Sequence, residues 1–176
     1  HLRALARGRV TTGVVKVAVI GSGALVGGVL LARGRGGGLV ATAVDAAGSA
    51  VVIASWANLL NLLDLRPGRA AKAAVVVCLP LLAGGGASRL LASGALGTAA
   101  ATLPEDLMER TMLGDTGANA LGALVGTALA AHPCHLLRVV AAGTATALVL
   151  ASEKVSFTQV IESTPLLDAL DRCGRL

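Results

Sequence analysis

Residues Leu39–Leu63 read LVATAVDAAGSAVVIASWANLLNLL, an apolar run that contains one charged residue, Asp45. The hydrocarbon core of a bilayer is crossed by an α-helix of about 20 mostly apolar residues, so this run is long enough to span it. An earlier run, Val14–Ala32, has the same character and contains only one charged residue, Lys16. Together the two runs predict a membrane protein built from α-helices.

Four further apolar runs follow, separated by short segments rich in glycine, proline and charge. The sequence therefore predicts an all-α, polytopic transmembrane helix bundle of about six spans over residues 1–151. Beyond it, residues 152–176 carry apolar side chains at helical spacing on a polar background, which predicts a tail of one or two amphipathic helices on the cytoplasmic membrane surface. The four runs are Ala70–Gly85, Ser88–Leu103, Met112–Ala131 and Cys134–Ala151.

Composition excludes several other classes of protein. Hydrophobic residues make up 55% of the chain and charged residues only 14%, whereas a soluble domain carries about a quarter charged residues. A disordered chain is excluded because such chains are poor in hydrophobic residues. The net charge of +5 does not indicate nucleic acid binding, because the chain has no dense basic cluster and almost no aromatic side chain to stack on bases.

The basic residues are distributed unevenly between the two predicted sides of the membrane. Eleven of the 15 lysines and arginines fall on the side that holds the N-terminus, within residues 1–16, 66–72, 110 and 154–175. Basic loops stay on the cytoplasmic side of a membrane. We therefore expect a multi-pass protein of the cell (plasma) membrane with both ends in the cytoplasm.

The first polar cluster lies at the predicted cytoplasmic end of the second span. Asn58, Asn61 and Asp64 step by three residues and so share one face of the helix. Arg66 and Arg69 follow at once, and cations beside a carboxylate suit an anion such as phosphate while one acid is kept for a metal or a proton. The alternative is an interfacial turn with arginines that reach the headgroups and asparagines that pair helices.

The second polar cluster is Met112–Gly122, MLGDTGANALG, at the predicted cytoplasmic start of the fifth span. Asp115 stands there among glycines, with Asn119 one helical turn further on. An isolated aspartate at a helix start can be a simple N-cap. Both clusters are predicted at the same membrane face, however, so we expect Asp64 and Asp115 to converge on one site.

The pair of motifs N-x-x-N-x-x-D and G-D-x-G-x-x-x-L-G resembles the polyprenyl-phosphate sugar-1-phosphate transferase family. This glycosyltransferase family includes the phospho-N-acetylmuramoyl-pentapeptide transferases and the undecaprenyl-phosphate N-acetylglucosamine-1-phosphate transferases. The stretch NLLDLRPGRA and the tail SFTQVIESTPLLDALDRCGR are similar to a less characterised bacterial branch. The resemblance covers essentially the whole chain, as the family's carboxy-terminal part.

The resemblance implies an Mg²⁺-dependent transfer of a sugar-1-phosphate, of N-acetylhexosamine type, from a UDP-sugar to a polyprenyl phosphate. UMP is released, and the product serves cell-envelope glycan synthesis, as in peptidoglycan formation. Asp64 and Asp115 are the implied catalytic residues; Asp115 is also the implied Mg²⁺ ligand, and Asp64 would take a proton from the lipid phosphate or help hold the metal. A homodimer is compatible with the sequence. The residues expected to bind substrate are Lys16, Asn58, Asn61, Arg66, Arg69 and Asn119.

Three departures from the family pattern bear on this interpretation. The family's adjacent aspartate pair is absent, and we interpret the only adjacent acids, Glu105 and Asp106, as part of a solvated loop. Pro67 stands where many members have another aspartate. The family's histidine-rich cytoplasmic loop is not visible. We expect the missing acids on a segment before His1, and little transferase activity from this chain alone.

Two other function classes remain as alternatives. The departures favour a non-catalytic relative that binds lipid phosphate or scaffolds envelope proteins. A transporter fits less well, because transporters place their polar groups near the middle of the bilayer, whereas here the polar clusters are predicted at one edge.

Overall fold

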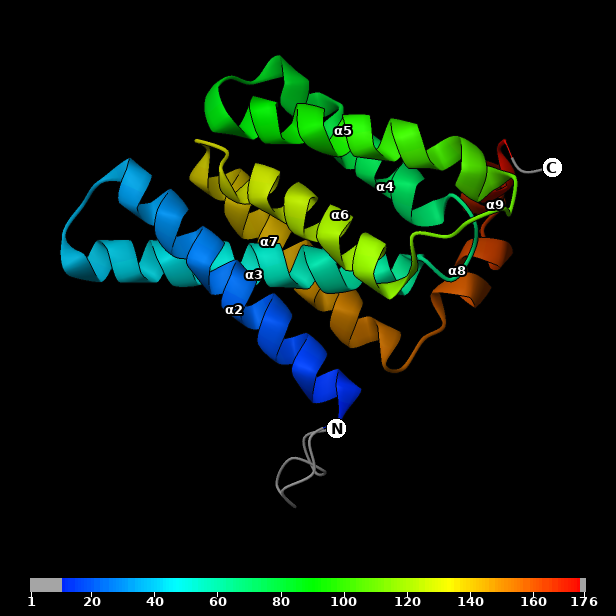
Figure 1. Cartoon of the computed structure of the whole chain (residues 1–176), viewed down its shortest axis with the longest axis horizontal. Helices are drawn as coiled ribbons and strands as arrows, with labels where there is room; N and C mark the ends of the chain where they lie inside the picture. The colour runs from blue at the N-terminus through cyan, green and yellow to red at the C-terminus, as the bar shows by residue number, and fades with distance from the viewer. Residues whose placement is uncertain (1–10, 175–176) are drawn as a thin grey trace.

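The computed structural model describes residues 11–174, and most of them are helical (Figure 1). They form eight α-helices and one short 3-10 helix, and this part of the chain contains no β-strand. The predicted all-α class is therefore confirmed. Residues 1–10 and 175–176 lie outside the described residues, and with them Arg3, Arg7, Arg9 and Arg175, which are four of the cations counted for membrane orientation.

The helices follow the predicted apolar runs, and the tail forms two short helices. Their bounds are α2 Thr12–Arg35, α3 Leu39–Leu63, α4 Arg69–Cys78, η1 Pro80–Ala83, α5 Gly86–Leu107, α6 Gly114–Ala130, α7 His135–Ser152, α8 Phe157–Ser163 and α9 Pro165–Arg172.

Glycine sets one boundary that was predicted from it, and proline adds one that was not predicted. Gly68 precedes α4 with a φ of 72°, a left-handed conformation that glycine adopts without steric cost. Pro80 begins η1 directly after α4, so the third predicted run is divided into two pieces. Proline has no N–H to continue an α-helical ladder, which explains the division.

Pro104 does not act as predicted. The fourth apolar run was expected to end before it, but α5 continues through Pro104 to Leu107. The Pro104 carbonyl still accepts a hydrogen bond from the backbone N–H of Met108 at 3.2 Å. One missing donor is thus tolerated near the end of a well-packed helix, and four residues expected in a loop, 104–107, become its last turn.

Helix α3 runs through the middle of the bundle and packs against α2, α6 and α7 (Figure 1). Helix α6 approaches α3 over two glycines. A Cβ atom added at Gly122 would lie 2.5 Å from the Trp56 carbonyl oxygen, and one at Gly126 would lie 2.8 Å from the Ile53 Cα atom. Small residues at such contacts let membrane helices pack backbone to backbone.

Three helices, α2, α3 and α7, are long and apolar enough to cross a membrane. Large apolar side chains such as Val17, Leu30, Val40 and Val139 are exposed on their surfaces, which suits contact with lipid. Helix α6 has 17 residues and α4 has 10. The prediction of about six spans is therefore not confirmed by the length and hydropathy of the described helices.

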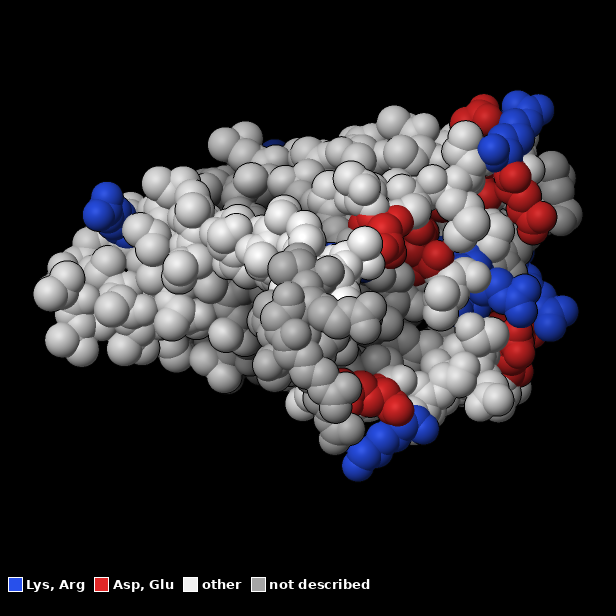
Figure 2. Space-filling view, turned by 60° about the horizontal axis from the view of Figure 1, so that its bottom comes forward, with Lys and Arg blue, Asp and Glu red and all other residues white. Residues whose placement is uncertain are grey.

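The bundle has two polar ends. We call the end with the start of α2, the α3–α4 turn (64–68) and the α5–α6 connection (108–113) the site end. The opposite end, with the connections at 36–38, 84–85 and 131–134, is the far end. On the face drawn in Figure 2, most charged side chains gather toward one end of the bundle, and a long uncharged surface separates them from a small basic patch at the other.

Candidate functional site

An ion pair joins α2 to α6 at the site end. Lys16 Nζ lies 3.3 Å from Asp115 Oδ1, and the two side chains are 29% and 78% exposed. Asp115 stands in the first turn of α6, where the helix dipole favours a negative charge. The N-cap residue of α6 is Leu113, and no side chain caps the helix. Asp115 is therefore not a simple N-cap, and its carboxylate faces a cation from another helix.

A pair of amides joins α3 to α6 beside this ion pair. Asn119 Nδ2 donates a hydrogen bond to Asn61 Oδ1 at 3.1 Å and also reaches the backbone carbonyl of Asp115. The side-chain oxygen of Asn119 is buried and has no hydrogen-bond partner. Asn58 lies half-buried on α3 about one turn before Asn61. The cluster thus keeps one unused oxygen, on the helical turn that follows Asp115.

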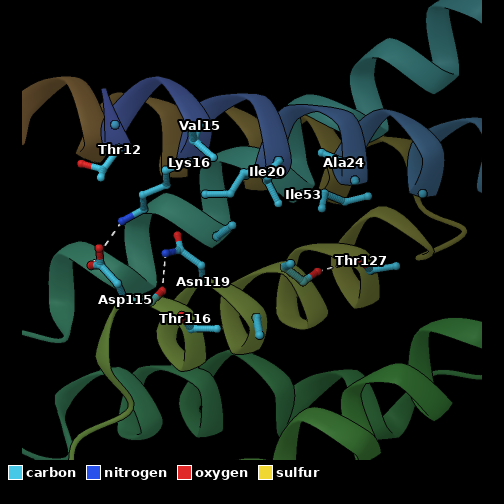
Figure 3. A pocket seen from close by; sticks show the side chains of 17 residues that line it. Thr12, Val15, Lys16, Ile20, Ala24, Ile53, Asp115, Thr116, Asn119 and Thr127 are labelled. Atoms are coloured by element: carbon cyan, nitrogen blue, oxygen red, sulfur yellow. Dashed lines mark hydrogen bonds and ion pairs between the residues drawn. The ribbon is translucent and has the colours of Figure 1, made fainter. Parts of the chain in front are cut away.

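A groove of about 870 Å³ opens beside this cluster, lined by residues of α2, α3 and α6 (Figure 3). Lys16, Asp115 and Asn119 lie together toward one end of the view, and Lys16 points across the groove to Asp115. The rest of the lining is mainly small or apolar. A cavity with one charged end and an apolar body matches an amphiphile with an anionic head. Apolar lining residues include Val19, Ile20, Gly23, Gly27, Ile53 and Ala123.

Asp64 lies behind the cluster as the C-cap of α3 and is only 8% exposed. Burial raises the pKa of Asp64 from 3.8 to about 6, and the negative charges of Asp106 and Asp115 act in the same direction. A backbone hydrogen bond from Gly114 opposes these effects. Gly114 precedes Asp115 directly, so the two predicted motifs meet at this point.

The two arginines of the first motif are bonded to the tail. Arg69 is buried and donates to both oxygens of Asp171, at 2.7 and 3.0 Å, and to Thr158 at 3.3 Å. Arg66 pairs with Glu162 at 3.2 Å. The expected phosphate contact of Arg69 is not supported by this geometry, because its guanidinium already binds α8 and α9.

Asp106 is a residue that the sequence interpretation missed. The expected solvated loop at Glu105 and Asp106 is wrong for Asp106, which is 1% exposed in the last turn of α5. Helical spacing could have indicated this, because the buried positions Ser88, Ala92, Ala95 and Ala99 extend at steps of three and four to 103 and 106. Because the helix was predicted to end before Pro104, position 106 was not recognised as part of its buried face.

The donor set at the Lys16–Asp115 cluster fits Mg²⁺. Carboxylate and amide oxygens are hard ligands, and Mg²⁺ commonly uses one or two carboxylates together with water and substrate phosphates. Asp115 is exposed, and the Asn119 oxygen next to it is unpaired. Within residues 11–174 no group of three or more His, Cys, Asp or Glu side chains is placed to hold a metal. A cation here would therefore rely on Asp115, Asn119 and ligands from outside the protein.

The structure thus divides the predicted site residues into two groups. Lys16, Asn61, Asp115 and Asn119 form one bonded cluster at the head of the groove, with Asp64 close behind it. Arg66 and Arg69 belong to the contact with the tail. The chain matches no protein-family model, no curated protein and no solved structure.

Proposed function

We propose that this protein is a membrane phosphoglycosyl transferase that acts on a polyprenyl phosphate and a UDP-sugar of N-acetylhexosamine type. One observation carries the proposal: the Lys16–Asp115–Asn119 cluster stands at the charged end of an otherwise apolar groove. A lipid phosphate has the same division, with a dianionic head on a hydrocarbon chain. Asn61 and Asp64 come from the first motif that resembles the transferase family, and Asp115 and Asn119 come from the second.

Each residue of the cluster has a distinct task in this proposal. Lys16 attracts the lipid phosphate to the mouth of the groove. Asp115 and the Asn119 oxygen hold Mg²⁺, which would neutralise negative charge on the phosphates. Asn61 fixes the Asn119 amide through its hydrogen bond, and the Asn119 oxygen is left without another partner.

We propose a multi-pass protein of the plasma membrane with the site end in the cytoplasm. Helices α5 and α6, and α4 together with η1, would complete about six spans because they pack alongside α3 and the helices around it. Leu166 and Leu170 of α9 are exposed, which suits a tail that rests on the headgroups.

A bulky residue placed in the groove tests lipid binding directly. Gly23 lines the groove, and a Cβ atom there would meet nothing within 4 Å. Gly23→Leu should therefore fill the groove without a clash and weaken binding of undecaprenyl phosphate at least about tenfold, or about 1.4 kcal/mol. Gly21→Leu is the matched control, since Gly21 has equal space on the same helix and is not part of the lining. Equal binding of undecaprenyl phosphate by both variants would show that the lipid does not bind in the groove.

The chemistry is tested by UMP release from UDP-N-acetylhexosamines by the full-length gene product, with undecaprenyl phosphate and Mg²⁺. Turnover that needs all three components supports the proposal. Binding of the lipid phosphate with no release of UMP, for any such sugar nucleotide, would support the second candidate function, a non-catalytic lipid-phosphate binder. Two observations favour that candidate: Pro67 replaces an aspartate of the family pattern, and Arg69 is engaged by Asp171.

A further inference from the structure

Asp106 is a buried acid without a partner. Both of its carboxylate oxygens are buried and accept no hydrogen bond, and the side chain is 1% exposed. It also stands in the last turn of α5, where the negative end of the helix dipole disfavours a carboxylate. An unpaired ionised carboxylate in such a place is costly, so the molecule must supply a positive partner or a proton.

Asp64 shares this environment. It caps the C-terminus of α3, is 8% exposed, and has one oxygen, Oδ1, without a partner. The negative charge of Asp106 acts on Asp64, so the two carboxylates lie within electrostatic reach. The turn after α3 also packs on the end of α5, because a Cβ atom added at Gly68 would lie 2.5 Å from Leu107 Cδ2. Three carboxylate oxygens without a hydrogen-bond partner thus belong to two helix ends that pack on each other.

The cations of the site end are directed elsewhere. Lys16 pairs with Asp115, Arg66 with Glu162, and Arg69 with Asp171. Among residues 11–174, no ion pair reaches Asp64 or Asp106. Lys72 is bonded to the backbone carbonyls of Leu170 and Asp171. The charge of the two acids therefore has to be balanced by a proton or by a cation that these pairs do not include.

We propose that Asp64 and Asp106 together bind a divalent cation of the Mg²⁺ class, at a site separate from Lys16 and Asp115. Hard oxygen ligands select Mg²⁺ or Mn²⁺, and two carboxylates with water complete a typical magnesium site. The cation neutralises both acids and the negative ends of α3 and α5. The proposal goes beyond the transferase function and does not depend on it, because it concerns cation binding alone.

Mn²⁺ is the probe, since it replaces Mg²⁺ and its bound fraction is measured by electron paramagnetic resonance. The purified full chain in nanodiscs is compared with variants in an Asp115→Asn background, which removes the other proposed ligand. We expect Asp115→Asn to keep a Mn²⁺ site, and the further change Asp106→Asn to weaken it at least about tenfold. Glu105→Gln is the matched control, because Glu105 is the exposed neighbour that pairs with Arg110.

A second variant and a second readout keep the test decisive. Asp64→Asn should weaken Mn²⁺ binding as Asp106→Asn does, and both should be monodisperse on size exclusion. Mg²⁺ should raise the thermal unfolding midpoint of the Asp115→Asn protein and leave that of either double variant unchanged. Mn²⁺ binding that is unaffected by both Asp64→Asn and Asp106→Asn overturns the proposal. So does an Asp115→Asn protein that binds no Mn²⁺ at neutral pH, which would mean that the two acids share a proton.

Discussion

Asp45 at the far end and Asp106 at the site end differ in their charge partners. At the far end, Asp45 on α3 receives two arginines, Arg35 from α2 and Arg138 from α7, the latter at 2.7 Å. Arg35 also donates to Ser49 at 3.3 Å and to the Ala130 carbonyl. At the site end, by contrast, Asp106 is more deeply buried than Asp45, and both of its oxygens are unpaired.

We interpret this difference as one between a charge cluster that joins helices, at Asp45, and a pair of acids that binds ligands, Asp64 and Asp106. At the far end the two arginines join α2 and α7 to Asp45 of α3, beside a cavity of about 500 Å³ that Asp45 and Arg138 line. Asp64 and Asp106 have no such partners, which lowers the stability of the fold. Ionisable groups that are buried without a partner in a membrane protein are typical of binding and catalytic sites. We therefore propose that the far-end cluster holds α2, α3 and α7 together and that the site end binds ligands.

The largest effect is expected from Asp115→Asn, which keeps the size of the side chain and removes its charge. In the full-length protein UMP release should fall at least about 100-fold, because metal stabilisation of the phosphates supplies several kcal/mol. Steady-state assays at several Mg²⁺ concentrations measure the loss. Arg89→Ala, at an exposed far-end position, should retain activity. Near-normal turnover of Asp115→Asn at every Mg²⁺ concentration would contradict this prediction. It would mean that Asp115 at the site end matters for activity as little as Arg89 at the far end.

The next largest effect is expected on stability, when Asp45 at the far end and Asp106 at the site end are each changed to asparagine. Asp45→Asn leaves two partly buried arginines without their acid and should cost about 2–3 kcal/mol. Asp106→Asn, measured with EDTA present, removes an unpaired charge and should leave stability unchanged or raise it. Thermal unfolding in detergent, followed by Trp56 fluorescence, measures both. A large loss on Asp106→Asn would show that Asp106 has a structural partner after all.

A smaller effect is expected where the tail meets the bundle. Arg69→Ala breaks the buried pair with Asp171 and should destabilise the docked tail by about 2 kcal/mol. Arg66→Ala breaks a half-exposed pair with Glu162 and should cost no more than about 0.5 kcal/mol. Limited proteolysis within residues 153–174 separates the two, with faster cleavage for Arg69→Ala only. Equal cleavage rates would mean that the tail is held by other contacts.

The smallest effect is a pH dependence that belongs to Asp64. The folded protein holds the Asp64 proton with a pKa of about 6, against 3.8 for an ordinary aspartate, so the proton is bound more tightly in the folded state. Without divalent cations, stability should therefore fall as the pH rises, by about 1 kcal/mol between about pH 5 and pH 7. Asp64→Asn should lack this component, which unfolding midpoints at the two pH values will reveal. An unchanged slope would place the titration on another group.

Much of the fold could be predicted from local patterns. Apolar runs and glycine or proline breaks place most helix ends within a few residues, since helix formation depends on neighbours in the chain. The same patterns failed at Pro104, because a proline stops a helix only when packing does not hold the last turn. They also predicted about six membrane spans, whereas only three of the described helices, α2, α3 and α7, are long and apolar enough to cross a membrane.

The candidate site could be predicted only in part. Spacing along α3 and α6 placed Asn61, Asp64, Asp115 and Asn119 at one end, because helical periodicity decides which side chains share a face. Which cation meets which acid was decided by packing alone. Arg69 and Asp171 are far apart in the sequence yet bonded, and Asp106 is buried because α5 docks against the α3–α4 turn. Ion pairs and burial arise between segments distant in the chain, so they have no local signal, and only the assembled bundle determines them.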